Sequence, residues 1–108
     1  MNLQQLQLEV AQWSFEQFGG KHGSGYRPLL GAVEELGELA HAHLKQEQGI
    51  RTNEDHQANK IDAVADTIIY LADYCSQQGI DLGQAVRVTW SEVRQRDWKA
   101  DKEKGEPK

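Results

Sequence analysis

The sequence has a single cysteine and no long hydrophobic run, and each of these two absences excludes a class of protein. Cys75 stands alone, so an intramolecular disulfide and a zinc site built from several cysteines are both excluded. It falls among apolar positions of an expected helix, where a buried thiol is the natural interpretation. No stretch approaches the roughly 18 apolar residues of a membrane span, and the N-terminus does not resemble a signal peptide. We therefore expect a cytoplasmic protein.

Positive charge is also scarce. Lys and Arg number 12 against 17 Asp and Glu, which gives a net charge of −5. Nucleic acids and membrane surfaces are polyanionic, so we expect the protein to bind neither a nucleic-acid polymer nor a membrane. A small anionic ligand held through a metal ion is compatible with this charge. The chain of 108 residues is expected to form one domain over residues 1–98, followed by a solvated, disordered tail over residues 99–108.

Apolar residues recur at three- and four-residue steps in four stretches, and they nowhere alternate long enough to indicate a strand. This periodicity predicts an all-α protein. Pro28 suits the first turn of the second helix, and Asp81 with Gln84 forms a capping-box pattern that starts the fourth. The first three helices are predicted at residues 3–18, from Pro28 to about residue 46, and at about residues 59–78.

Two connections in this scheme differ in character. Residues 19–25 are rich in glycine and carry Lys21, and Arg27 follows just beyond. The backbone of such a loop can approach a phosphate closely, but the spacing is not that of a Walker-type loop and no strand precedes it, so a flexible connector is the preferred interpretation. Residues 47–59 are largely polar and are expected to form a mobile connection or lid.

The second helix carries three carboxylates without a nearby positive charge. At helical spacing a broad apolar arc that includes Leu36 forms one side, Glu34 and Glu38 lie on the other, and Glu35 lies at the border. No Lys or Arg stands one turn away from any of the three. Two carboxylates about 4 Å apart repel by roughly 1 kcal/mol in water and by more where solvent is excluded. A cation would relieve that repulsion.

The third helix repeats this arrangement. Asp62 and Asp66 lie opposite its apolar arc, again without a Lys or Arg one turn away. Ile69 and Tyr70 fall on the same acidic side, which indicates that this side is partly covered. Side by side, the two helices would form an all-oxygen cluster, and hard oxygen ligands favour magnesium, manganese or calcium over zinc. Its members are Glu34, Glu35, Glu38, Asp62 and Asp66.

Two other interpretations of the acids compete with a metal site. Acidic residues on one helix face are most often only solvated, although two consecutive helices with unpaired acids make this explanation less favourable. Glu38 and His41 match the Glu-x-x-His unit of di-iron bundles, but the third helix offers no histidine for a second unit. We interpret His41 and His43 as packing or solvated groups rather than ligands.

The acidic residues carry a family resemblance. Glu34-Glu35-Leu-Gly-Glu38, followed by Asp62-Ala-Val-Ala-Asp66, resembles the Glu-Glu-x-x-Glu and Glu-x-x-Asp motifs of the MazG-like, all-α nucleotide pyrophosphohydrolases. The segment from Trp13 to Phe18 and the link Gly79-Ile-Asp-Leu are also similar to that family. The resemblance implies a four-helix bundle completed by homodimerisation, as a dimer or a dimer of dimers.

The resemblance also implies a reaction. Enzymes of that family use magnesium to cleave a nucleoside triphosphate into a monophosphate and pyrophosphate, often in nucleotide-pool housecleaning. By position, Glu35, Glu38 and Asp66 would hold Mg²⁺, for which Mn²⁺ is a possible substitute, and Glu34 would be a further ligand or the base that orients water. The pattern departs at Ala63, where the family has glutamate. Asp62 can substitute there with a shorter reach, which leaves the number of metal ions open.

Substrate-binding candidates follow from charge and ring chemistry. The basic candidates for the outer phosphates are Lys21, Arg27, Lys60 and Arg94. Trp13, Phe18 or Tyr70 could stack on a base, although aromatic residues at helical spacing usually pack in a core. The alternative to an enzyme is a catalytically weak helical module that keeps the acidic pocket to sense a nucleotide or hold a partner protein, and Ala63 is the feature that favours it.

Overall fold

The structure, a computed structural model, describes residues 1–19, 25–97 and 99. This part of the chain contains four helices and no strand, which confirms the all-α prediction. None of these helices is long and apolar enough to cross a membrane. The predicted tail lies outside the described residues except for Lys99. The helices are α1 (Leu3–Phe18), α2 (Tyr26–Gln48), α3 (His56–Gln78) and α4 (Leu82–Val93).

Side-chain caps determine where three of the helices begin. At the start of α1, Asn2 accepts a hydrogen bond from the Gln5 backbone N–H and the Gln5 side chain accepts one from the Asn2 N–H, both at 2.8 Å. The Asp81 carboxylate accepts from the Gln84 N–H at 3.0 Å, as the capping pattern predicted. The prediction for α3 was wrong by three residues, because Asp55 caps the helix by accepting from the Ala58 N–H at 3.0 Å.

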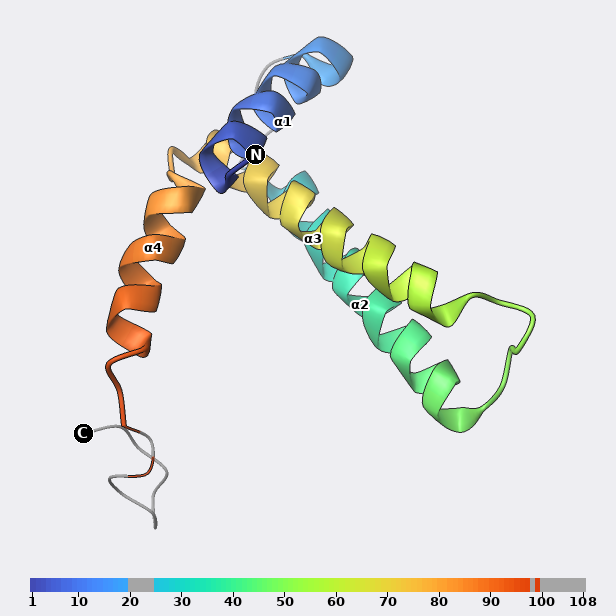
Figure 1. The fold of residues 1–108 in the computed structure, drawn as a ribbon. Coiled ribbons are helices and arrows are strands. Elements are labelled where there is room, and N and C mark those ends of the chain that lie inside the picture. Colours follow the sequence, from blue (N-terminus) through green and yellow to red (C-terminus); the bar gives the residue numbers. More distant parts are fainter. Residues whose placement is uncertain (20–24, 98, 100–108) are drawn as a thin grey trace.

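Helices α2 and α3 run antiparallel as a long hairpin, and α1 packs against α3 at the end away from the α2–α3 connection (Figure 1). Helix α4 leaves from the same corner as α1 and diverges from the hairpin. Gln7 of α1 ties this corner together: its Nε2 donates to the Ile80 carbonyl at 2.7 Å, and its Oε1 accepts from the Leu82 N–H at 2.9 Å. The connection between α2 and α3 is residues 49–55, shorter than predicted.

Small side chains fill most of the buried positions. On α2 these positions include Gly31, Ala32 and Ala42, and on α3 they include Ala63 and Ala72. Small residues allow helix backbones to approach closely, but they bury little apolar area. Val10 and Cys75 add to the core, and burial raises the pKa of the Cys75 thiol, in agreement with the predicted buried thiol.

The apolar arcs of the helices stay exposed in the single chain. On α2, Val33 and Leu36 are 60% and 56% exposed, and on α3 Val64 is half exposed. On α4 apolar side chains are likewise uncovered, with Trp90 59% exposed. Gly31 on α2 and Ala63 on α3 are buried instead, and a Cβ atom at Gly31 would meet the Tyr70 ring of α3. The hairpin therefore keeps a large apolar surface open to solvent.

Candidate functional site

Two cavities lie one after the other along the α2–α3 hairpin. The first, which we call the apolar cavity, has a volume of about 440 Å³ and lies where α1 covers the hairpin. The second, the acidic cavity, has a volume of about 540 Å³ and extends toward the connection between α2 and α3. Glu35 lines both cavities, so it lies at their junction.

The apolar cavity has aromatic walls from helices α1 and α3. Trp13 and Phe18 pack edge to face, with ring centroids 5.7 Å apart, and Tyr70 contributes from α3. None of the three is buried, so they are available at the cavity surface rather than sealed in a core. Its lining residues are Val10, Trp13, Ser14, Phe18, Arg27, Pro28, Glu35, Asp66, Ile69, Tyr70, Asp73 and Gln77.

Polar side chains also line the apolar cavity. The Asp73 carboxylate accepts a hydrogen bond from Ser14 Oγ at 3.4 Å and another from Gln77 Nε2 at 3.3 Å. The sequence analysis did not include this group among the site candidates. Its signal was available, because Asp73 follows Asp66 by seven residues, about two helical turns, and so lies on the same side of α3.

The acidic cavity combines side chains from both helices with two from their connection. Glu38 and His41 come from α2 and Asp62 from α3, so His41 lines the same cavity as these acids. Arg51 and Glu54 come from the connection, which sequence analysis treated only as a mobile segment. The lining residues are Glu35, Glu38, His41, Ala42, Arg51, Glu54, Asn59, Asp62 and Ala63.

Glu35 is the electrostatic centre of the site. Its pKa is raised above its ordinary value, first because desolvation disfavours the charged carboxylate, and then because Asp66, Glu38 and Glu34 repel it. These four carboxylates therefore share one electrostatic field. Glu34 itself is exposed and lines neither cavity.

Basic partners do not balance these acids. In residues 1–19, 25–97 and 99, the ion pairs are His43 with Glu47 at 3.6 Å and Arg51 with Glu54 at 3.8 Å. Glu35 and the three carboxylates that repel it take part in neither pair, as their sequence spacing predicted. The exposed pair of His43 with Glu47 agrees with its interpretation as a solvated group.

The donor chemistry fits a hard divalent ion. Glu35, Glu38, Asp62 and Asp66 offer only oxygen, which suits Mg²⁺ or Mn²⁺ better than zinc. Within the described part of the chain, no group of three or more His, Cys, Asp or Glu side chains is close enough together to hold a metal ion.

The position at which this sequence departs from the motif that it resembles is part of the acidic cavity. Ala63 is 2% exposed and lines this cavity, so a methyl group stands where the resembled motif has a carboxylate. Asp62 lines the same cavity from the preceding position and is exposed. A carboxylate from α3 is thus available beside Ala63.

The basic candidates have separate locations. Arg27 lines the apolar cavity, with its guanidinium 6.0 Å from the centroid of the Tyr26 ring. Lys60 lines neither cavity, and its Nζ donates to Gln46 Oε1 at 2.6 Å, which links α3 to α2. Arg94 lies just after α4, and Lys21 lies outside the described residues.

Comparisons of the chain with protein families, with curated proteins and with solved structures find no match in any of the three. The function must therefore be inferred from the two cavities and the acidic motifs. The most informative feature is the order of chemical environments along the hairpin. Aromatic walls come first, then the junction at Glu35, and then the acidic cavity.

Proposed function

We propose that the protein is a Mg²⁺-dependent nucleoside triphosphate pyrophosphohydrolase that releases a nucleoside monophosphate and pyrophosphate. The observation that carries this proposal is the meeting of an apolar, aromatic cavity and an acidic cavity at Glu35. A nucleoside triphosphate has its chemical groups in the same order as the cavities. Its flat, apolar base would suit the apolar cavity, and its polyanionic triphosphate, which binds metal ions, would suit the acidic one. Both cavities have volumes typical of small-molecule sites.

The reaction joins a water oxygen to the α-phosphorus and breaks the bond from that phosphorus to the oxygen that bridges to the β-phosphate. The electron pair of the broken bond leaves with pyrophosphate, and one water proton must be accepted. Glu35 is our candidate acceptor, because it lies where the two cavities meet, which is where this proposal places the α-phosphate. When bound, Mg²⁺ or Mn²⁺ would neutralise the charge of the phosphates. Glu38, Asp62 and Asp66 are the residues that would hold it, and Glu35 beside them would stay available for the proton.

The apolar cavity supplies a rationale for base binding. Trp13 and Tyr70 present ring surface to this cavity, and stacking on aromatic rings suits any nucleobase. Arg27 lines the same cavity and carries a positive charge near the base and sugar rather than near the outer phosphates. A housecleaning role in the nucleotide pool is consistent with a site that relies on stacking, which discriminates weakly among bases.

We also propose that two copies of the chain associate. Large exposed apolar surfaces on soluble proteins mark interaction sites, and the arcs of α2 and α3 form such a surface with Leu29, Val33, Leu36, Ile61 and Val64. Each arc lies on the side of its helix away from the acids that line the cavities. A second copy packed on these arcs would therefore bury apolar area and leave the cavities open.

A test of the reaction is the incubation of a panel of standard and modified nucleoside triphosphates with Mg²⁺, followed by separation of the products. We expect equal amounts of monophosphate and pyrophosphate from at least one substrate. Glu38→Ala should reduce turnover by orders of magnitude and leave the fold intact, because Glu38 is exposed. Glu47→Ala is the matched control, since Glu47 lies on the same helix and lines neither cavity.

A catalytically weak sensing or partner-binding module is the second candidate. Ala63 favours it, because the acidic cavity carries a methyl group where the related motif has a carboxylate. Such a module would bind a nucleotide with Mg²⁺ in a calorimetric titration and release no pyrophosphate. Turnover that Glu38→Ala abolishes would exclude it.

A further inference from the structure

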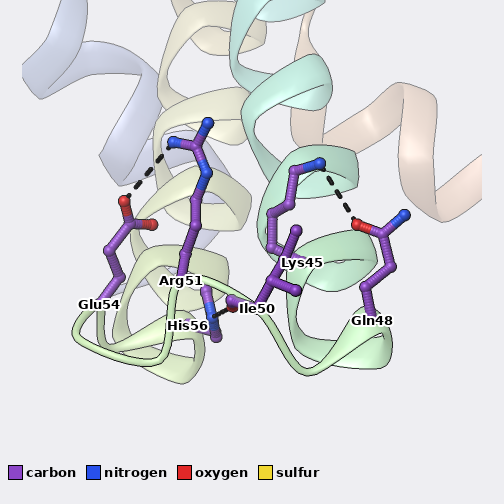
Figure 2. A network of polar contacts seen from close by, with 6 residues as sticks. All are labelled: Lys45, Gln48, Ile50, Arg51, Glu54 and His56. Carbon is purple, nitrogen blue, oxygen red and sulfur yellow. Dashed lines mark hydrogen bonds and ion pairs between the residues drawn. The ribbon is translucent and has the colours of Figure 1, made fainter.

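Arg51 differs in charge from the rest of the acidic cavity. Among the described residues that line this cavity it is the only lysine or arginine, and four of its companions are acidic: Glu35, Glu38, Glu54 and Asp62. Figure 2 shows its side chain reaching from the connection back toward the body of the hairpin. The cavity therefore has carboxylates from the helices and from Glu54, and one guanidinium that enters from the connection.

The backbone on both sides of Arg51 is anchored. The imidazole Nε2 of His56 lies 3.0 Å from the carbonyl oxygen of Ile50, directly before Arg51, as Figure 2 shows. The Arg51 carbonyl accepts a hydrogen bond from the Glu54 N–H at 3.0 Å. Arg51 has φ of +53°, and it is the only non-glycine residue with positive φ among those described. This left-handed conformation is unfavourable for a residue with a Cβ atom and is favourable for glycine. The hydrogen bonds of the neighbouring backbone therefore hold Arg51 in a conformation that arginine rarely adopts.

The guanidinium of Arg51 forms only a weak ion pair. Its ion pair with Glu54 has an N–O distance of 3.8 Å, and the two side chains are 54% and 37% exposed. An exposed pair at this distance contributes little to stability. The arginine fork has five N–H donors and matches the oxygens of a phosphate group in a bidentate arrangement. Arg51 is thus free to exchange Glu54 for an anionic ligand.

We propose that Arg51 binds the outer phosphates of the substrate, the part that leaves as pyrophosphate. This inference rests on the proposed function. With the base in the apolar cavity and the α-phosphate near Glu35, a triphosphate chain continues through the acidic cavity toward the connection, where Arg51 lies. Two other basic candidates are less suited to bind the outer phosphates. Lys60 donates a hydrogen bond to the Gln46 side chain, and Arg27 lines the apolar cavity.

The test measures inhibition by the two products separately. We expect Arg51→Ala to weaken inhibition by pyrophosphate with Mg²⁺ at least tenfold, to raise KM for the triphosphate by a similar factor, and to leave inhibition by the monophosphate unchanged. Arg51→Lys should lie between, because an ammonium keeps the charge and loses the fork. Arg87→Ala, on α4 and outside both cavities, is the control for removal of an arginine.

Arg51→Gly separates the side chain from the backbone. Glycine accepts positive φ readily, so this variant removes the guanidinium and favours the observed backbone. We expect it to fold at least as well as wild type and still to lose pyrophosphate inhibition. Unchanged inhibition and unchanged KM in Arg51→Gly, with turnover by the wild type, would overturn the role of Arg51 alone. Absence of turnover by the wild type would instead overturn the proposed function.

Discussion

The ring of Tyr70 occupies the space that a Cβ atom on Gly31 would need. Gly31 is buried on α2, and Tyr70 lines the apolar cavity from α3. The missing side chain at Gly31 therefore allows the ring to lie against the α2 backbone. The wall of the cavity depends on this contact, which connects the close packing of the hairpin to the site.

Gly31→Ala is predicted to displace the Tyr70 ring, which should raise KM for the substrate and lower the stability of the protein. Overpacking of this kind typically costs about 1–3 kcal/mol. Gly37→Ala is the matched control, because a Cβ atom there meets nothing within 4 Å. It should stabilise α2 by roughly 0.5–1 kcal/mol and leave KM unchanged. Thermal unfolding and steady-state kinetics measure both effects, and equal behaviour of the two variants would contradict the contact.

Glu35 predicts a pH dependence of stability in the absence of metal. Its pKa is raised in the folded protein, so folding favours the neutral carboxyl over the carboxylate. The resulting contribution to the free energy of unfolding is fully present below pH 4.5, and it is lost as the pH rises through the folded-state pKa. Glu35→Gln keeps a neutral group there, so it should be more stable than wild type at neutral pH.

The advantage of Glu35→Gln should shrink as the pH falls through the raised folded-state pKa of Glu35 toward 4.5, and it should be small below 4.5, where the wild-type carboxyl is also neutral. Denaturation by urea with a chelator present, at pH 7 and near pH 4, measures the difference. Glu47→Gln, outside both cavities, should show no such trend. A constant difference between Glu35→Gln and wild type across this range would mean that Glu35 does not titrate as described.

Magnesium should stabilise the folded protein through the same carboxylates. A ligand that binds only the folded state at 100 times its Kd stabilises it by about 2.7 kcal/mol. We expect Mg²⁺ to raise the Tm of wild type and of Glu47→Gln, and to have little effect on Asp66→Asn. Equal shifts in Asp66→Asn and wild type would show that Mg²⁺ binds elsewhere or only nonspecifically.

The exposed arcs predict a dimer that one substitution can disrupt. Leu36 on the α2 arc is 56% exposed, so Leu36→Glu should fold as a monomer because a charge in an apolar interface is costly. Leu8→Glu on α1 changes an exposed leucine outside the arcs and should leave the dimer intact. Size-exclusion chromatography with light scattering distinguishes the 12.2 kDa monomer from twice that mass. A wild-type monomer at micromolar concentration would contradict the proposed association.

Sequence periodicity predicted four helices but not which sides of them meet. The apolar arcs are visible in the sequence, yet contact between α2 and α3 is made where Gly31, Ala42 and Ala63 allow a close approach. Which residues are buried depends on the distance between the two helix backbones, and the periodicity of the sequence does not determine that distance. The start of α3 was missed for a local reason, because the Asp55 cap precedes a polar turn without apolar periodicity.

Helix spacing determines that Glu35 and Glu38 lie away from the apolar arc of α2 and that Asp62 and Asp66 share a side of α3, so the sequence could group these acids, and their role as ligands stays a prediction. Arg51 could not be predicted in this way. Its position depends on the path of the connection and on a positive φ that arginine rarely adopts, and no spacing rule indicates either. The pairing of Ser14 with Asp73 likewise depends on how α1 crosses α3, which requires the tertiary structure.

The most direct test of the central claim is hydrolysis of nucleoside triphosphates in water enriched in ¹⁸O, with Mg²⁺ and with chelator. The account predicts Mg²⁺-dependent formation of monophosphate and pyrophosphate in equal amounts, with the heavy oxygen in the monophosphate. That result would locate the attack at the α-phosphorus. Release of orthophosphate, label in the pyrophosphate, or no turnover of any nucleotide in the panel would contradict it.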